Sequence, residues 1–137
     1  MFGRFPKVLV AILASLVLVA IMATGASSHS GPLTGTWSGF MRQGSGSTAP
    51  RHHLRLVVNA SERGGSWRIS ARCLGSLRLK NISNGYHHYI EVLAPGATCR
   101  GGGIDCLKRV GAGLYDTFQS PPGTKYDNDG TLRRVVG

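Results

Sequence analysis

Short runs of alternating hydrophobic and polar residues follow one another along the last three quarters of the chain, separated by glycine, proline, asparagine and serine. The alternation is clearest in residues 66–73, where Trp67, Ile69, Ala71 and Cys73 occupy every second position. Such runs at a spacing of about 8 to 12 residues are typical of an all-β sandwich or barrel. The pattern predicts strands at residues 34–41, 52–59, 66–73, 76–82, 86–94, 104–110, 114–119 and 131–136.

The connections between these runs indicate how the strands pair. Asn84–Gly85 is a strong hairpin signal and predicts that residues 76–82 pair with residues 86–94. Residues 126–131, which contain the sequence DNDG, are expected to form a turn before the last strand. Strands that pair with their neighbours in sequence form an antiparallel meander, so the expected fold is a small barrel or sandwich of about eight strands.

The N-terminal segment has the order of a secretory signal peptide. Arg4 and Lys7 precede residues 8–23, which are apolar except for Ser15, and small polar residues follow. Cleavage is expected after Ala26, and an uncleaved membrane anchor is the alternative. Sixteen residues rise about 24 Å as a helix, less than the roughly 30 Å hydrocarbon core, which favours cleavage.

Either outcome places the rest of the chain outside the cytoplasm, secreted or held at the cell envelope, because Arg4 and Lys7 keep the N-terminus inside. About 110 residues then remain, enough for one small domain. The expected division is residues 1–26 as the signal peptide, 27–33 as a short linker and 34–137 as a single β domain.

The chain is strongly basic, with 16 Lys and Arg against 6 Asp and Glu and a formal charge of +10. Removal of residues 1–26 takes away two basic residues and no acid, which leaves +8. An exported basic protein meets anionic cell-wall polymers and membrane surfaces, which are the partners that the charge suggests. The basic residues are scattered, and we expect no specific binding to nucleic acid.

Three cysteines, Cys73, Cys99 and Cys106, allow one disulfide and one remaining thiol in an oxidising compartment. A Cys73–Cys99 bridge closes about 27 residues and stabilises by about 3.5 kcal/mol in the chain-entropy model, against about 2.5 kcal/mol for Cys99–Cys106. We favour the first pairing and leave the second open. Cys106 is then a candidate free thiol that can link two chains into a dimer.

No metal or cofactor is expected. The cysteine spacing does not give a tetrahedral zinc site, and His52–His53 and His87–His88 each offer one ligand per strand face. The glycines at 101–103 lack the lysine and the helix of a phosphate-binding loop. DNDG at 127–130 lacks the further ligands of a calcium loop.

The acids that best suit catalysis are Glu91, Asp105 and Asp116, because they lie on three predicted strands and can share one face. Glycosidases use two such carboxyl groups, and Cys106 is the only candidate for a nucleophilic thiol. The spacing of these residues matches no catalytic motif. We therefore assign no catalytic residue and keep an envelope hydrolase as an alternative function.

Several segments spread over the predicted β domain carry a resemblance. They are LTGTWSG at 33–39, CLGSLRL at 73–79, YIEVLAPGATCRGGGID at 89–105, LYDTF at 114–118 and GTLRR at 130–134. In this order they resemble the small extracytoplasmic β domain of actinobacterial secreted proteins and serine/threonine-kinase ectodomains. The resemblance implies a Cys73–Cys99 disulfide and a role in binding or sensing at the cell envelope, while Cys106 departs from that pattern.

A shorter resemblance covers only GTW at 35–37, which is similar to the G-x-W that opens the first strand of lipocalins and related calycins. That resemblance implies an eight-stranded barrel closed near Trp37, with a small apolar pocket. The function expected first is a non-enzymatic binding or sensing module at the cell envelope. The alternative is a lipocalin-like carrier of a small apolar ligand.

Overall fold

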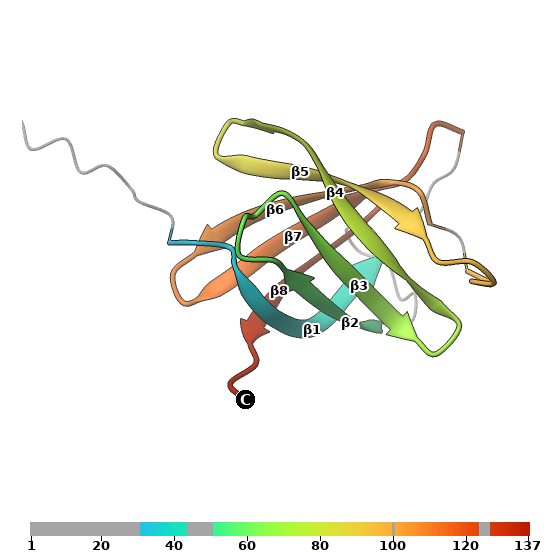
Figure 1. Cartoon of the computed structure of the whole chain (residues 1–137), viewed down its shortest axis with the longest axis horizontal. Coiled ribbons are helices and arrows are strands. Elements are labelled where there is room, and N and C mark those ends of the chain that lie inside the picture. The colour runs from blue at the N-terminus through green and yellow to red at the C-terminus, as the bar shows by residue number, and fades with distance from the viewer. Residues whose placement is uncertain (1–30, 44–50, 100, 124–126) are drawn as a thin grey trace, which may run out of the picture.

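The computed structural model describes residues 31–43, 51–99, 101–123 and 127–137. In this part of the chain, eight strands form one closed antiparallel barrel, in which each strand pairs with its sequence neighbours and β1 pairs with β8 (Figure 1). The expected all-β meander is confirmed, and it is a barrel rather than a sandwich. The strands are β1 (Gly35–Gln43), β2 (His52–Val58), β3 (Gly64–Ser70), β4 (Cys73–Ser83), β5 (Tyr86–Leu93), β6 (Ile104–Val110), β7 (Gly113–Gln119) and β8 (Asn128–Arg134).

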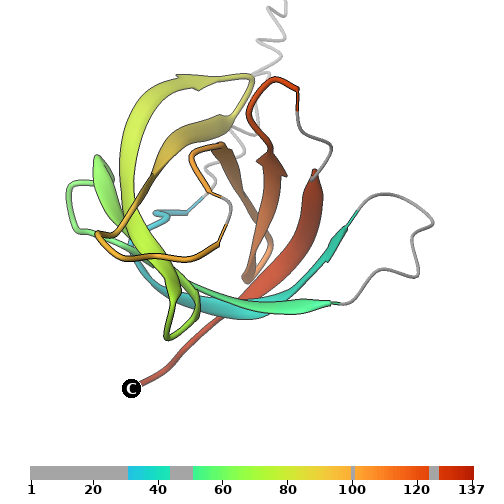
Figure 2. The ribbon, with the colours of Figure 1, turned by 90° about the vertical axis from the view of Figure 1, so that its right-hand side faces the viewer.

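The strands alternate in direction, so their connections lie at two ends of the barrel. The loops after β2, β4 and β6 lie at one end, which we call the closed end, and the loops after β3, β5 and β7 lie at the other, the open end. Figure 2 shows the strands as a ring, with the loop after β5 (orange) reaching across part of the open end. The predicted hairpin between β4 and β5 is confirmed, with φ values of 52° at Asn84 and 77° at Gly85, as a type I′ turn requires.

Two expected boundaries were wrong. Residues 66–73 do not form one strand: a two-residue turn follows Ser70, the end of β3, Cys73 begins β4, and Ala71 is exposed instead of buried. Cys73 nevertheless faces the interior and is 7% exposed. A sequence pattern of period two does not reveal so tight a turn when neither turn residue is glycine or asparagine.

The expected turn at residues 126–131 is the second error, because Asn128, Asp129 and Gly130 belong to β8. Asp129 pairs with Thr117 of β7 and with Arg42 of β1. Closing the barrel requires β8 to bond to two strands along its length, and these ladders override the local preference of Asn, Asp and Gly for turns.

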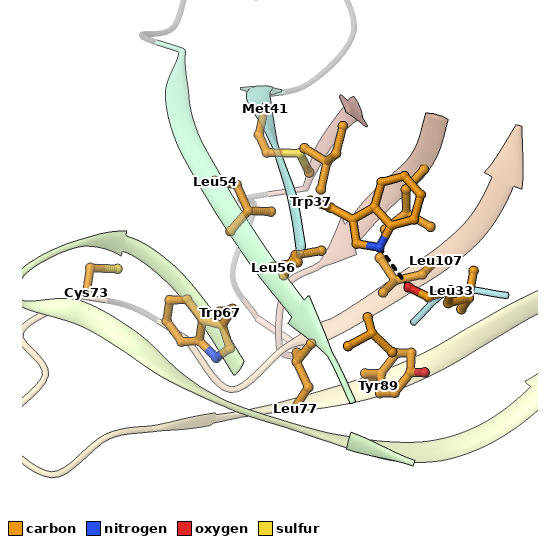
Figure 3. Close-up of a cluster of buried hydrophobic side chains, with 13 residues drawn as sticks. Leu33, Trp37, Met41, Leu54, Leu56, Trp67, Cys73, Leu77, Tyr89 and Leu107 are labelled. Atoms are coloured by element: carbon orange, nitrogen blue, oxygen red, sulfur yellow. Dashed lines mark hydrogen bonds between the residues drawn. The ribbon is translucent and has the colours of Figure 1, made fainter. Parts of the chain in front are cut away.

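The closed end is a packed core built around Trp37 (Figure 3). The indole Nε1 of Trp37 donates a hydrogen bond to the carbonyl of Leu33 over 2.7 Å, and the Leu33 amide donates to Glu62 Oε1 over 2.6 Å. The guanidinium carbons of Arg109 and Arg134 lie 4.7 and 4.6 Å from the Trp37 ring centre. The packed domain therefore begins at Leu33, a buried residue within the expected linker 27–33.

The predicted signal peptide (residues 1–26), its expected cleavage after Ala26 and residues 27–30 of the expected linker lie outside the described residues. Within the ranges that the structure describes, no helix has the length and apolar character needed to cross a membrane.

Candidate functional site

A cavity of about 370 Å³ occupies the open end of the barrel. Its size falls in the lower part of the range of small-molecule binding sites, which is roughly 300 to 1,000 Å³. Met41, Leu54, Trp67, Ile69 and Phe118 form apolar walls that come from four strands. The polar residues of the lining are His52, Gln43, Asn128, Glu91 and Asp105.

The loop after β5 forms one wall of this cavity and is fastened to β4. Cys73 and Cys99 both line the cavity and form the disulfide that was favoured from the sequence, with Cα atoms 5.2 Å apart. The amide of Thr98 donates to the carbonyl of Arg72 over 2.8 Å, and the amide of Ala94 donates to that of Leu74 over 3.0 Å. The wall is therefore held by both a covalent bond and backbone hydrogen bonds.

Trp67 contributes the largest side chain to the cavity wall and is 2% exposed. Its indole Nε1 has no hydrogen-bond partner among the described residues. The ring lies against β4, where a Cβ atom on Gly75 would be 2.8 Å from Nε1. Gly75 is thus required for the indole to pack on the strand, and the ring closes the side of the cavity without a polar anchor of its own.

Glu91, Asp105 and Asp116 point into the barrel from β5, β6 and β7, as their shared face in the sequence pattern suggested. They are 7%, 1% and 0% exposed. Asp105 is within hydrogen-bonding reach of both other carboxyl groups. Glu91 and Asp105 line the cavity, and Asp116 lies deeper in the barrel.

No N–H or O–H group within the described part of the chain donates to Asp105 Oδ2 or to either oxygen of Asp116. A contact between two carboxyl groups becomes a hydrogen bond only when one of them carries a proton. Burial, together with the charge of Asp105, raises the pKa of Glu91 to about 10. Burial likewise raises the pKa of Asp105 to about 7, and burial with the charge of Asp105 holds the pKa of Asp116 well above its usual value. Without a ligand, the cluster therefore holds protons at neutral pH.

The carboxyl groups do not have the arrangement of a glycosidase. Retaining enzymes hold their two carboxyl groups about 5 to 5.5 Å apart and inverting enzymes hold them farther apart, so that a sugar or a water molecule fits between them. Glu91 and Asp105 are instead in direct hydrogen-bonding contact. The arrangement suits a shared proton, or a donor group bound by both carboxyl groups, better than hydrolysis.

Cys106 is buried outside the cavity, where its Sγ atom lies 3.2 Å from His88 Nδ1. His88 Nε2 in turn lies 3.0 Å from Ser83 Oγ. Burial raises the pKa of Cys106, whereas nucleophilic cysteines have a lowered one. With 3% exposure, the thiol must also turn outward before it can link two chains, and that link stays a prediction.

The histidines are dispersed over the barrel. His52 lines the cavity and has a pKa lowered by burial, while His53 contacts Ser38 at 2.8 Å on the outer surface. His87 lies 3.5 Å from Glu62. His53 and His88 lie on β2 and β5, which do not pair. Over the described ranges, no group of three or more His, Cys, Asp or Glu side chains is placed to hold a metal ion.

The sequence pattern did not show the cavity or the contact between Glu91 and Asp105. Alternation gives the face of each strand, and it placed both acids on the same face correctly. The contact depends on the register between β5 and β6, where Ile90 pairs with Ile104, and no turn signal in the long connection fixes that register.

Comparison of the chain with protein-family models, with curated proteins and with solved structures finds no match.

Proposed function

We propose that this protein is an exported binding module that takes a small, mainly apolar molecule into the open end of its barrel. The observation that carries this proposal is the cavity of about 370 Å³, with apolar walls on four strands and a rim fastened by Cys73–Cys99. Small-molecule sites have this composition, with apolar walls and a few polar groups. The closed end, packed by Trp37 and Leu33, supports a carrier whose entrance lies at the other end.

Location outside the cytoplasm rests on the signal-like segment at residues 8–23 and on the disulfide, which persists in oxidising compartments. The similarity of GTW at 35–37 to the opening strand of lipocalins points to the same kind of carrier. The similarity to actinobacterial extracytoplasmic domains favours the cell envelope as the place of action.

A neutral ligand tests the proposal without depending on charge. We expect 1-octanol to bind the full chain in isothermal titration calorimetry, with a negative heat-capacity change as apolar surface is buried. Replacing Ile69, which lines the cavity, with tryptophan should abolish binding. Ile82→Trp, on the exposed outer side of β4, is the matched control and should leave binding unchanged. Equal binding by the two variants, or none by the unmodified chain, contradicts the proposal.

The outer surface supports a second candidate, binding to an anionic envelope polymer. Arg55 of β2 and Arg68 of β3 are directly opposite each other and exposed. Ser38 of β1 pairs with Arg55 on one side and with Arg133 of β8 on the other, so the three arginines form one row across the strands. Arg55 and Arg68 also border a hollow of about 290 Å³. Because three of the six acids are inside the barrel, few negative charges offset these arginines.

This candidate predicts retention on a heparin column that weakens as salt screens the charges. The double variant Arg55→Gln/Arg68→Gln should elute at lower salt than Arg63→Gln, which removes one exposed arginine from the closed end. Elution of the double variant at the same salt as the control excludes the arginine row as the binding surface.

A further inference from the structure

The cavity of this basic protein has an acidic polar lining. The described part of the chain contains three acids buried in the barrel, while its arginines and lysines face outward or cover the closed end. We propose that the cavity binds a small organic amine, whose ammonium group is held between Glu91 and Asp105 and whose apolar part lies against Trp67 and Phe118. This inference rests on the proposed function and names the chemical class of its ligand.

The first argument is the supply of unused acceptors. Glu91 and Asp105 come from adjacent strands and line the same cavity, and the Glu91 amide bonds the carbonyl of Gly103 over 3.0 Å, which fixes the two strands at this point. Asp105 is only 1% exposed, and no described residue donates a hydrogen bond to its Oδ2 atom. An alkylammonium group carries three N–H donors and can bond both carboxyl groups at once.

The second argument is the sign of the charges. No lysine or arginine among the described residues lines the cavity, so a carboxylate or phosphate ligand would find no cationic partner there. His52 is the one basic side chain in the described lining, and burial lowers its pKa, which keeps it neutral at pH 7. An ammonium group is the charged ligand group that this lining attracts.

The third argument is the energy of desolvation. Taking a carboxylate out of water is costly, and a bound cation usually has to compensate for this loss. Here folding has already removed water from the carboxyl groups, which it leaves protonated, and the ammonium group supplies the positive charge that a buried carboxylate requires once a proton is displaced. Asp116, whose raised pKa keeps it protonated, lies outside the cavity lining and does not compete for the ammonium group.

Binding then exchanges cations. The ammonium ion enters, one proton leaves the Glu91–Asp105 pair for solvent, and the net charge of the cavity does not change. Such an exchange is easier at higher pH, so amine affinity should rise between pH 6 and pH 8 while the ligand stays protonated. The other titratable groups that face the pair are Asp116 on β7 and His52 on β2. The linings from β1, β3, β4 and β8 are Met41, Gln43, Trp67, Ile69, Cys73 and Asn128, which carry no charge.

The test uses three ligands of one chain length: octylamine, 1-octanol and octanoate, each titrated into the full chain at pH 8 in a calorimeter. We expect octylamine to bind about tenfold or more tighter than 1-octanol, since hydrogen bonds to charged groups contribute about 1.5 to 3 kcal/mol. Octanoate should bind more weakly than 1-octanol. Asp105→Asn and Glu91→Gln should each bring the ratio of octylamine affinity to 1-octanol affinity down to about one. Asp129→Asn, outside the cavity lining, is the matched control.

The outcomes separate the two proposals. Equal affinity for octylamine and 1-octanol, or an amine advantage that survives Asp105→Asn and Glu91→Gln, overturns the amine inference and leaves the binding function standing. Failure of all three ligands contradicts both. Competition of calcium or magnesium ions with octylamine would show that the pair takes a metal ion, which also overturns the inference. A rise in octylamine affinity from pH 6 to pH 8, absent for 1-octanol, supports it.

Discussion

The two tryptophans of this barrel occupy its two ends and are both buried, but they differ in hydrogen bonding and in how completely their surroundings are filled. Trp37 is fully buried, donates its indole N–H to Leu33 and is covered by two arginines. Trp67 is almost as buried, yet its N–H has no partner in the described structure and its ring borders a cavity. Figure 3 shows Trp37 close to Leu33 and Leu107, and Trp67 on the side of Cys73.

The two ends of the barrel are therefore suited to different roles, one in stability and one in binding. The closed end fills its volume with apolar side chains and gives the indole of Trp37 a hydrogen-bond partner, which stabilises the fold. The open end keeps empty volume and unpaired buried oxygens, and both of these cost stability. A binding site needs empty volume and polar atoms that are free to bond a ligand, and the open end has both.

The largest expected effect comes from exchanging each tryptophan for alanine. Trp37→Ala should lower the free energy of unfolding by about 3 to 5 kcal/mol, because it opens a cavity in a filled core and removes the ring under two guanidinium groups. Trp67→Ala should cost less, since the ring already borders empty space, and it should weaken 1-octanol binding. Urea titration followed by circular dichroism measures both free energies. Equal losses at the two positions would refute the division of the barrel into a stabilising end and a binding end.

The disulfide gives the next largest effect. Replacing Cys73 and Cys99 with serine removes the cross-link over a sequence separation of 26 residues, and the chain-entropy model gives a loss of about 3.5 kcal/mol. The loss should appear in the urea midpoint of the oxidised protein and should match the effect of reducing agent on the unmodified chain. Cys106→Ser leaves that bridge intact and is the control, so its urea midpoint in the oxidised state should be close to that of the unmodified chain.

The pH dependence of stability tests the open end directly. The raised pKa values of Asp105, to about 7, and of Glu91, to about 10, mean that the folded state binds more protons than the unfolded state above about pH 4. Stability should therefore fall as the pH rises from 4 to 7, by up to about 1.4 kcal/mol per unit for each group. The lowered pKa of His52 acts in the opposite direction near pH 6.5 and only partly offsets this fall.

Asp105→Asn should flatten this slope and raise stability at pH 7, because a neutral amide replaces a carboxyl group that titrates in the barrel. Urea midpoints at pH 4, 5.5 and 7 measure the slope, with Asp129→Asn as the control for the loss of an acid on the outside. A slope that is unchanged in Asp105→Asn would mean that the buried acids do not titrate as their surroundings require.

Much of the fold followed from the alternation of residues, and the site did so only in part. The hairpin at Asn84–Gly85 was found because both residues favour the left-handed conformation that its turn needs. The start of β4 at Cys73 was missed because a two-residue turn without glycine leaves the alternation intact. Local sequence carries turn chemistry and strand faces, and those are the features that were predicted well.

The contacts between distant strands were beyond such reasoning. Arg109 and Arg134 meet on Trp37 from β6 and β8, and nothing near either arginine in sequence indicates that ring. The cavity depends likewise on how eight strands close and on how much of the interior their side chains fill. A closed barrel fixes these quantities together, through strand number and stagger, and no single segment contains them.

The smallest effect concerns the arginines that cover Trp37. Arg134→Met keeps most of the apolar stem but removes the guanidinium group that lies 4.6 Å from the ring centre, and a cation over an aromatic face contributes about 0.5 to 1 kcal/mol at such a site. Arg133→Met is the matched control, because Arg133 is exposed one residue earlier on β8 and pairs opposite Ser38. Urea unfolding should show a loss of this size for Arg134 and almost none for Arg133. Since neither arginine touches the cavity, 1-octanol affinity should not change, and a change would show that the two ends are coupled through the barrel.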